Sequence, residues 1–127
     1  DYALLATFAC FFVFSGNLAR VPAVQGFLGA LLAQGAFFPS LLACQLISNV
    51  PAAILLAPFT QDWAGLLLGV DVGGLGTIVA SLASLITLTE FNRCMPRNTG
   101  RFMLVFTAFN VVFLVVLVAL VLCLGLA

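Results

Sequence analysis

The sequence contains no histidine, and charged residues make up only 6% of its 127 residues. Four positive and four negative side chains give a formal net charge of zero. The chain therefore has neither a basic surface for nucleic acid nor an acidic tail, and we expect no nucleic-acid partner. The four cysteines occur singly, without a CxxC motif or a histidine that would complete a zinc set. We interpret them as packing thiols and expect no metal site built on them.

Sequence signatures of intramembrane enzymes are also missing. A rhomboid protease needs GxSG and a histidine, whereas this chain has VFSG and no histidine. The aspartyl type needs a paired GxGD, which does not occur. We therefore expect no enzyme and no organic cofactor.

Hydrophobic residues are abundant instead, at 65% of the chain, and the mean hydropathy is +1.32. A soluble domain is roughly half apolar and about one quarter charged. We therefore expect an all-α, multi-pass protein of the inner or plasma membrane, with the lipid bilayer as its solvent. Because the chain starts without Met and its longest polar stretch is short, we expect a fragment of a longer protein that contains no soluble domain.

The chain divides into apolar runs separated by polar residues. Residues 1–17 predict a transmembrane helix, and 102–127 predict another. Residues 18–34 are less apolar and suit an interfacial helix, with a short tilted span as the alternative. The loop 90–101 carries three of the four arginines, which predicts a cytoplasmic position.

Residues 36–59 are long enough to cross a bilayer, yet polar side chains and a proline lie at their centre. Two arms of about ten residues, each about 15 Å long, would reach only the midplane. This pattern predicts a re-entrant hairpin, in which Asn49 caps a new helix and Pro51 occupies its first turn. The alternative is one full span kinked at Pro51.

Residues 62–89 predict a discontinuous transmembrane helix, because three glycines closely follow Asp71 and disfavour an unbroken helix. We expect its second half to begin near Gly76 or Thr77. A carboxylate near the bilayer centre costs roughly 2.5 to 3.5 kcal/mol, so Asp71 could carry a proton or hold Na⁺. Alternatively, Asp71 caps the broken helix or lies at the interface. The pairs Gly65–Gly69 and Gly69–Gly73 also match the helix-packing pattern GxxxG.

Two breaks at membrane depth favour a binding site, because irregular backbone there must be satisfied by protein or by a water-filled cavity. Discontinuous helices point positive N-terminal ends at anionic groups, and unwound carbonyls hold the coupling ion. The predicted substrate and ion-binding residues are Ser48, Asn49, Val50, Pro51, Asp71, Gly73, Gly74, Gly76 and Thr77, with Asn17 as a secondary candidate.

Three segments resemble a known family. FFVFSGNLARVP, QLISNVPAAILLAPFT and LLLGVDVGGLGTIVASLASLI are similar to the C-terminal repeat of the ion transporter superfamily. This superfamily (ArsB/NhaD) includes divalent-anion/Na⁺ symporters, citrate transporters, arsenite permeases and NhaD-type Na⁺/H⁺ antiporters. In it, two inverted repeats each contribute a hairpin and an unwound helix. Ser48 and Asn49 match the tip motif, whereas Val50 replaces a Thr and Asp71 often stands as Asn in relatives.

The resemblance implies the C-terminal half of an ion-coupled secondary transporter with an elevator-like movement. Its substrate would be a small anion such as a di- or tricarboxylate or an inorganic oxyanion, coupled to Na⁺ or H⁺. The missing N-terminal repeat would complete the site, and a homodimer is a further expectation. Two alternatives remain open within transport, a Na⁺/H⁺ antiporter and an arsenite efflux permease. From another class, a non-transporting structural membrane subunit is the alternative.

Overall fold

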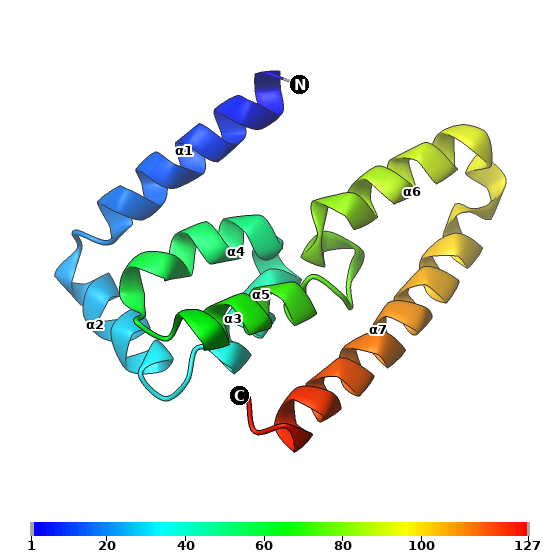
Figure 1. The fold of residues 1–127 in the computed structure, drawn as a ribbon. Helices are drawn as coiled ribbons and strands as arrows, with labels where there is room; N and C mark the ends of the chain where they lie inside the picture. Colours follow the sequence, from blue (N-terminus) through cyan, green and yellow to red (C-terminus); the bar gives the residue numbers. More distant parts are fainter. Residues whose placement is uncertain (1, 127) are drawn as a thin grey trace.

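The computed structural model describes residues 2–126, which form helices and contain no strand. The expected all-α class is confirmed for this part of the chain. The elements in order are α1 (Tyr2–Leu18), α2 (Pro22–Leu32), α3 (Phe37–Ile47), α4 (Asn49–Leu56), η1 (Ala57–Phe59), α5 (Trp63–Gly73), η2 (Ile78–Ala80), α6 (Leu82–Cys94), η3 (Pro96–Asn98) and α7 (Thr99–Cys123). Helices α2 to α5 form the packed centre, and α1, α6 and α7 extend away from it (Figure 1).

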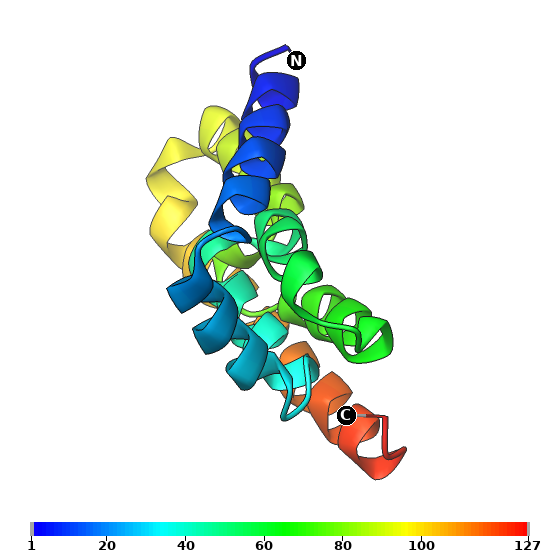
Figure 2. The same ribbon diagram turned by 90° about the vertical axis from the view of Figure 1, so that its left-hand side faces the viewer.

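A sharp bend separates the first two helices. Residues Leu5–Leu18 of α1 and Pro22–Leu32 of α2 differ in direction by 97°. Val21 is extended because the residue before a proline is pushed out of helical conformation, and Pro22 then starts the next helix. The bend turns α2 alongside the central helices instead of continuing along α1 (Figure 2).

Helices α3 and α4 form a helical hairpin. The chain breaks at Ser48, whose φ of 74° and ψ of 154° interrupt both helices. At the other end, the backbone N–H of Ala36, just before α3, donates to Oδ2 of Asp62, just after η1, over 3.1 Å. After the hairpin, the chain therefore returns at Asp62 to the N-terminal end of α3. A single uninterrupted helix does not occur over 37–59.

Helix α5 lies beside α3 and runs in the same direction, since Asp62 joins their N-terminal ends and Gln45 joins their C-terminal ends. The two backbones approach closely because α5 presents glycine to α3. A Cβ on Gly73 would lie 2.8 Å from Cα of Leu41. The GxxxG spacing at Gly69 and Gly73 therefore serves helix packing here, as the alternative interpretation held.

The helix that starts with α5 is interrupted after Gly73 and resumes as η2 and then α6. The α-helix restarts at Leu82 instead of near Gly76 or Thr77, because Thr77 donates its N–H to a side chain of α3 and Ser81 provides the cap. At the other end, α6 continues to Cys94 and α7 begins at Thr99. The polar segment 90–101 is thus mostly helical, and only a short turn separates the two helices.

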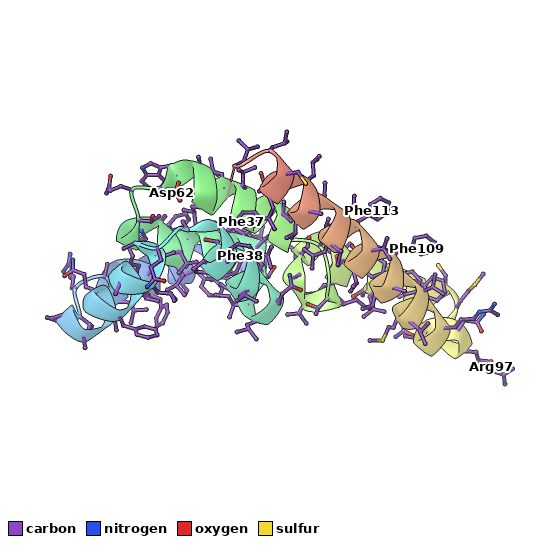
Figure 3. All side chains as sticks on the ribbon, turned by 90° about the horizontal axis from the view of Figure 1, so that it is seen from below. Phe37, Phe38, Asp62, Arg97, Phe109 and Phe113 are labelled. Atoms are coloured by element: carbon purple, nitrogen blue, oxygen red, sulfur yellow. The ribbon has the colours of Figure 1, made fainter. Side chains whose placement is uncertain are left out.

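Two apolar clusters hold the centre together. The first joins α2, α3, α4 and α5 through Leu32, Ala36, Cys44, Ala52, Leu56, Leu66 and Val70. The second packs Val121 near the end of α7 against Phe37, Leu41 and Val72. Leu114, Leu117 and Val118 of α7 are partly buried against this cluster. On the outward-facing side of α7, Phe109 and Phe113 are exposed and project away from the molecule (Figure 3).

One segment in the described chain is both long and apolar enough to cross a membrane. It is Pro96–Cys123, with 28 residues and a mean hydropathy of 2.9. The bent pair α1 and α2 would make a second if it formed one span, whereas α3, α4 with η1, and α5 are shorter. The multi-pass arrangement therefore stays a prediction.

Candidate functional site

The hairpin tip meets the broken helix at the C-terminal end of the α3–α5 pair. The side chain of Gln45 on α3 connects the two. Its Nε2 donates to the carbonyls of Gly73, over 2.7 Å, and of Leu75, over 2.8 Å. Its Oε1 accepts the backbone N–H of Thr77 over 3.1 Å. One carboxamide thus bonds three backbone groups across the interruption.

Asn49 at the start of α4 lies against the same interruption. A Cβ built on Gly74 would be only 3.0 Å from Nδ2 of Asn49, so the two residues are in close contact. The helix cap is Ser48, and the side-chain oxygen of Asn49 accepts the adjacent Val50 N–H over 2.9 Å. Asn49 therefore occupies the first turn of α4 instead of the cap position that the sequence predicted.

Ser48 has a backbone conformation that is normally found at glycine. Among the described residues, it is the non-glycine residue with positive φ. Such conformations cost of order 1–3 kcal/mol and cluster at ligand sites and switch regions. The side chain is half-buried and makes no hydrogen bond within the described chain.

A cavity of about 390 Å³ opens beside the tip, between α1, α4 and α5. Its lining is mostly apolar and comprises Phe8, Phe12, Asn49, Val50, Ala53, Ile54, Val70 and Asp71. Asp71 is exposed, and its carboxylate has no hydrogen bond or ion pair within residues 2–126. The cavity therefore combines one amide and one free carboxylate in an apolar wall.

The structure gathers most of the predicted residues at this end of the hairpin. They are Ser48, Asn49, Val50, Asp71, Gly74, Gly76 and Thr77. Pro51 sits half-buried in the first turn of α4, and Gly73 is buried against α3. Asn17 is not part of this group, because its side chain is exposed and donates to Val13 O of its own helix over 2.7 Å.

Positive charge is remote from the tip. All four arginines are exposed, and Arg93 pairs with Glu90 over 3.2 Å. No arginine lines the cavity described above. An anion at the tip would therefore depend on backbone N–H groups, hydroxyls and amides, which can donate without a formal charge.

The opposite end of the α3–α5 pair is held by Asp62. Its carboxylate accepts the N–H of Gly65 over 2.9 Å and that of Ala36 over 3.1 Å. These two donors, Gly65 first and Ala36 second, lower the pKa of Asp62 from its usual value. Asp62 thus caps α5 and ties α3 to it at the same time.

Sequence reasoning did not single out Gln45 or Asp62 as key residues. A signal for Gln45 was present, since a glutamine inside an apolar arm must find polar partners when it is buried. For Asp62, the signal was an acidic residue immediately before a predicted helix start. The partners of Gln45 lie 28 to 32 residues away along the chain, and the Ala36 partner of Asp62 lies 26 residues away. The sequence pattern does not identify these distant partners.

Two curated proteins are similar to this chain. An uncharacterized transporter of Methanocaldococcus jannaschii is 38% identical over 122 residues, which covers 94% of this chain and 33% of that protein. The inner membrane protein YbiR of Escherichia coli is 38% identical over 95 residues, which covers 72% of this chain and 26% of that protein. The chain thus spans a third or less of the length of these relatives. Their names point toward a membrane transporter-like protein, as the composition does.

No protein-family model matches the chain, and no solved structure matches it.

Proposed function

We propose that this chain forms the C-terminal half of an ion-coupled secondary transporter for a small anion, in the inner or plasma membrane. The observation that carries the proposal is the contact between the hairpin tip at Asn49 and the broken helix at Gly74. Two interrupted helices that meet in this way match the general design of transporter binding sites. The similarity to a protein named as a transporter supports the same class.

The lengths of the helices support a site near the bilayer midplane. Helices α3 and α5 each contain 11 residues, and each is therefore about 16 Å long. The hydrocarbon core is about 30 Å thick, so two parallel helices that start at one interface would end near its centre. In this proposal the ends tied by Asp62 lie at the interface and the ends tied by Gln45 lie at depth.

An anion at this depth would be held without a positive side chain. The first turn of α4 begins at Asn49 with the positive end of the helix dipole. The backbone N–H of Asn49 has no acceptor in the described chain, whereas that of Val50 donates to the Asn49 side chain and Pro51 has none. The Ser48 hydroxyl and the Asn49 amide add neutral donors next to it. This combination suits a small carboxylate or inorganic oxyanion better than a large solute.

Asp71 supports cation coupling as part of the same proposal. Its carboxylate shares a cavity with Asn49 and would repel a bound anion. A proton or a Na⁺ ion on Asp71 would remove that repulsion, so that the cation and the anion bind together. The unpaired carboxylate also favours the second candidate function, Na⁺/H⁺ exchange, in which the cation itself is the cargo.

The test is uptake by proteoliposomes that contain the full-length protein, with labelled succinate, citrate and sulfate as probes. We expect Asn49→Ala to abolish uptake while the protein still inserts into the membrane. Asn110→Ala is the matched control, because the Asn110 amide donates to Phe106 O within α7. Retained uptake in Asn49→Ala would remove the hairpin tip from the binding site.

Imposed gradients separate the candidate functions. Anion uptake that needs an inward Na⁺ or H⁺ gradient supports symport, whereas Na⁺-driven proton movement without any anion supports exchange. Arsenite is tested as an additional solute. Transport of arsenite would support the arsenite efflux permease over the other candidates. A structural membrane subunit predicts no transport and no solute-dependent protection of Asn49→Cys against thiol labelling.

A further inference from the structure

We infer that Gln45 is a positioning residue that holds the unwound segment 74–77 against the hairpin tip. The inference concerns the arrangement of the backbone, and only its consequence for uptake rests on the proposed function. Through Gln45, α3 and the broken helix would together position the residues that contact a solute.

The hydrogen bonds of Gln45 supply the first line of argument. Carbonyls at the C-terminal end of a helix have no intrahelical donor, and Nε2 of Gln45 satisfies that of Gly73, the last residue of α5. It also satisfies the carbonyl of Leu75 in the unwound segment. The N–H of Thr77 lies beyond the helix and is satisfied by Oε1. Only a carboxamide side chain both donates twice and accepts in this way. In the bilayer core, no water would be present to bond these two carbonyls and the Thr77 N–H if the carboxamide were removed.

Gly76 provides an independent observation. Its φ is +105°, and a Cβ at this position would lie 2.6 Å from Oε1 of Gln45. The backbone of the interruption therefore passes so close to the carboxamide that a side chain does not fit between them. The backbone of segment 74–77 therefore packs directly against the Gln45 carboxamide, and its course depends on where that group lies.

The consequence for the site follows through Asn49. Gly74 belongs to the segment that Gln45 holds, and it contacts the amide of Asn49. If the carboxamide no longer donates, the segment separates from the tip more often while both helices remain formed. Affinity for a solute at the tip should fall, whereas the turnover of bound solute should change little.

The first test measures opening of the segment without any solute. Gln45→Glu keeps nearly the same shape and keeps an acceptor for Thr77, but its carboxyl group donates to neither carbonyl when ionised and to only one when protonated. Ile78 is 8% exposed and directly follows the segment, so Ile78→Cys reports its opening. Ser15 is 3% exposed at the contact between α1 and α4, so Ser15→Cys reports general loosening. The four native cysteines are replaced in both reporters.

A hydrogen bond contributes modestly in net terms. Loss of one or both of them raises the labelling rate of Ile78→Cys with a small thiol reagent by about three- to tenfold or more. The labelling rate of Ser15→Cys should not change. Gln25→Glu is the matched control, because Gln25 is exposed on α2 and its side chain makes no hydrogen bond in the described chain. An unchanged rate at Ile78→Cys, or an equal increase at both reporters, would overturn the inference.

The second test measures uptake of succinate, citrate and sulfate by the full-length protein. With any of these that the parent transports, we expect Gln45→Glu to raise KM about tenfold with a much smaller change in maximal rate. A fall in maximal rate at unchanged KM would contradict a positioning role. Absence of uptake by the parent would count against the proposed function, and the labelling result would still decide the role of Gln45.

Discussion

The two ends of the α3–α5 pair are tied by different side chains, and the difference follows from what each end offers. Helix N-termini present N–H donors, so the acceptor-only carboxylate of Asp62 satisfies both helices at once. The opposite end presents two carbonyls and one N–H, so Gln45 must donate and accept. The side chain that joins the helices at each end is therefore determined by whether that end presents N–H groups or carbonyls.

The two ends also differ in charge and exposure. Asp62 is exposed beside Trp63, whose side chain is 51% exposed, as is typical of residues at a membrane interface. Gln45 is half-buried at the end that the proposal places deep in the bilayer. A neutral amide costs far less to bury than an ionised group, provided that its hydrogen bonds are made. The charged Asp62 at the outer end and the neutral Gln45 at depth agree with this rule.

A pair of glycines gives the largest expected difference between the two ends. Gly76 lies at the Gln45 end with φ +105° and little space, whereas Gly35 lies next to Ala36 at the Asp62 end with φ +124° and open space. Alanine with positive φ costs about 1–2 kcal/mol at either position. The overlap with Gln45 adds about 1–3 kcal/mol at Gly76 alone.

Gly76→Ala should therefore lower the apparent thermal midpoint of the detergent-purified protein clearly more than Gly35→Ala. Both substitutions place alanine at positive φ, so the difference between their midpoints reports the contacts of the new Cβ at Gly76. These contacts are with Oε1 of Gln45 and, at 3.3 Å, with Cδ2 of Leu114. Equal midpoints would mean that the carboxamide moves aside without loss. In that case the Gln45 end of the α3–α5 pair would tolerate a new side chain as easily as the Asp62 end.

Breaking the Asp62 end should have a smaller effect. Asp62→Asn keeps one acceptor oxygen but leaves the second N–H facing an amide nitrogen, so about 1 kcal/mol of stability is lost. Glu90→Gln is the control, because Glu90 forms an exposed ion pair with Arg93 that contributes little. The midpoints of the two variants are compared with that of the parent. If Glu90→Gln destabilises as much as Asp62→Asn, the shared cap at Asp62 has no special role.

The smallest effect is expected from pH. Because hydrogen bonds lower the pKa of Asp62 in the folded chain, its ionised form stabilises the fold fully above the unfolded value, which is about 3.9. This contribution is lost as the pH falls below that value and through the folded pKa. The difference in thermal midpoint between the parent and Asp62→Asn should therefore shrink between pH 7 and pH 3. A constant difference would show that the charge of Asp62 does not matter.

The sequence predicted the interruptions better than it predicted what holds them. Pro51 and the glycines after Asp71 disfavour continuous helix locally, and the chain breaks at Ser48, three residues before Pro51, and again after Gly73. The restart of α6 at Leu82 depends on a bond between Thr77 and Gln45 that joins residues 32 positions apart. Local propensity contains no information about such a contact.

The remaining differences have the same origin. The 97° bend before α2 needed the geometry of Pro22, whereas composition indicated only a less apolar segment. The helical character of the polar segment after Glu90 is supported by stacking of Phe91 on Phe102, with ring centres 4.2 Å apart. Those aromatic residues belong to two different helices, so charge alone suggested a loop. The grouping of Asp71 with Asn49 around one cavity likewise required the fold.

The positive φ of Ser48 has a consequence for the conformational energy of the hairpin. A residue other than glycine that is held at φ 74° stores of order 1–3 kcal/mol in the backbone. Any rearrangement that returns this residue to an ordinary conformation recovers that energy. A hairpin that turns at serine therefore needs less free energy to change shape than one that turns at glycine, and its resting form is correspondingly less stable.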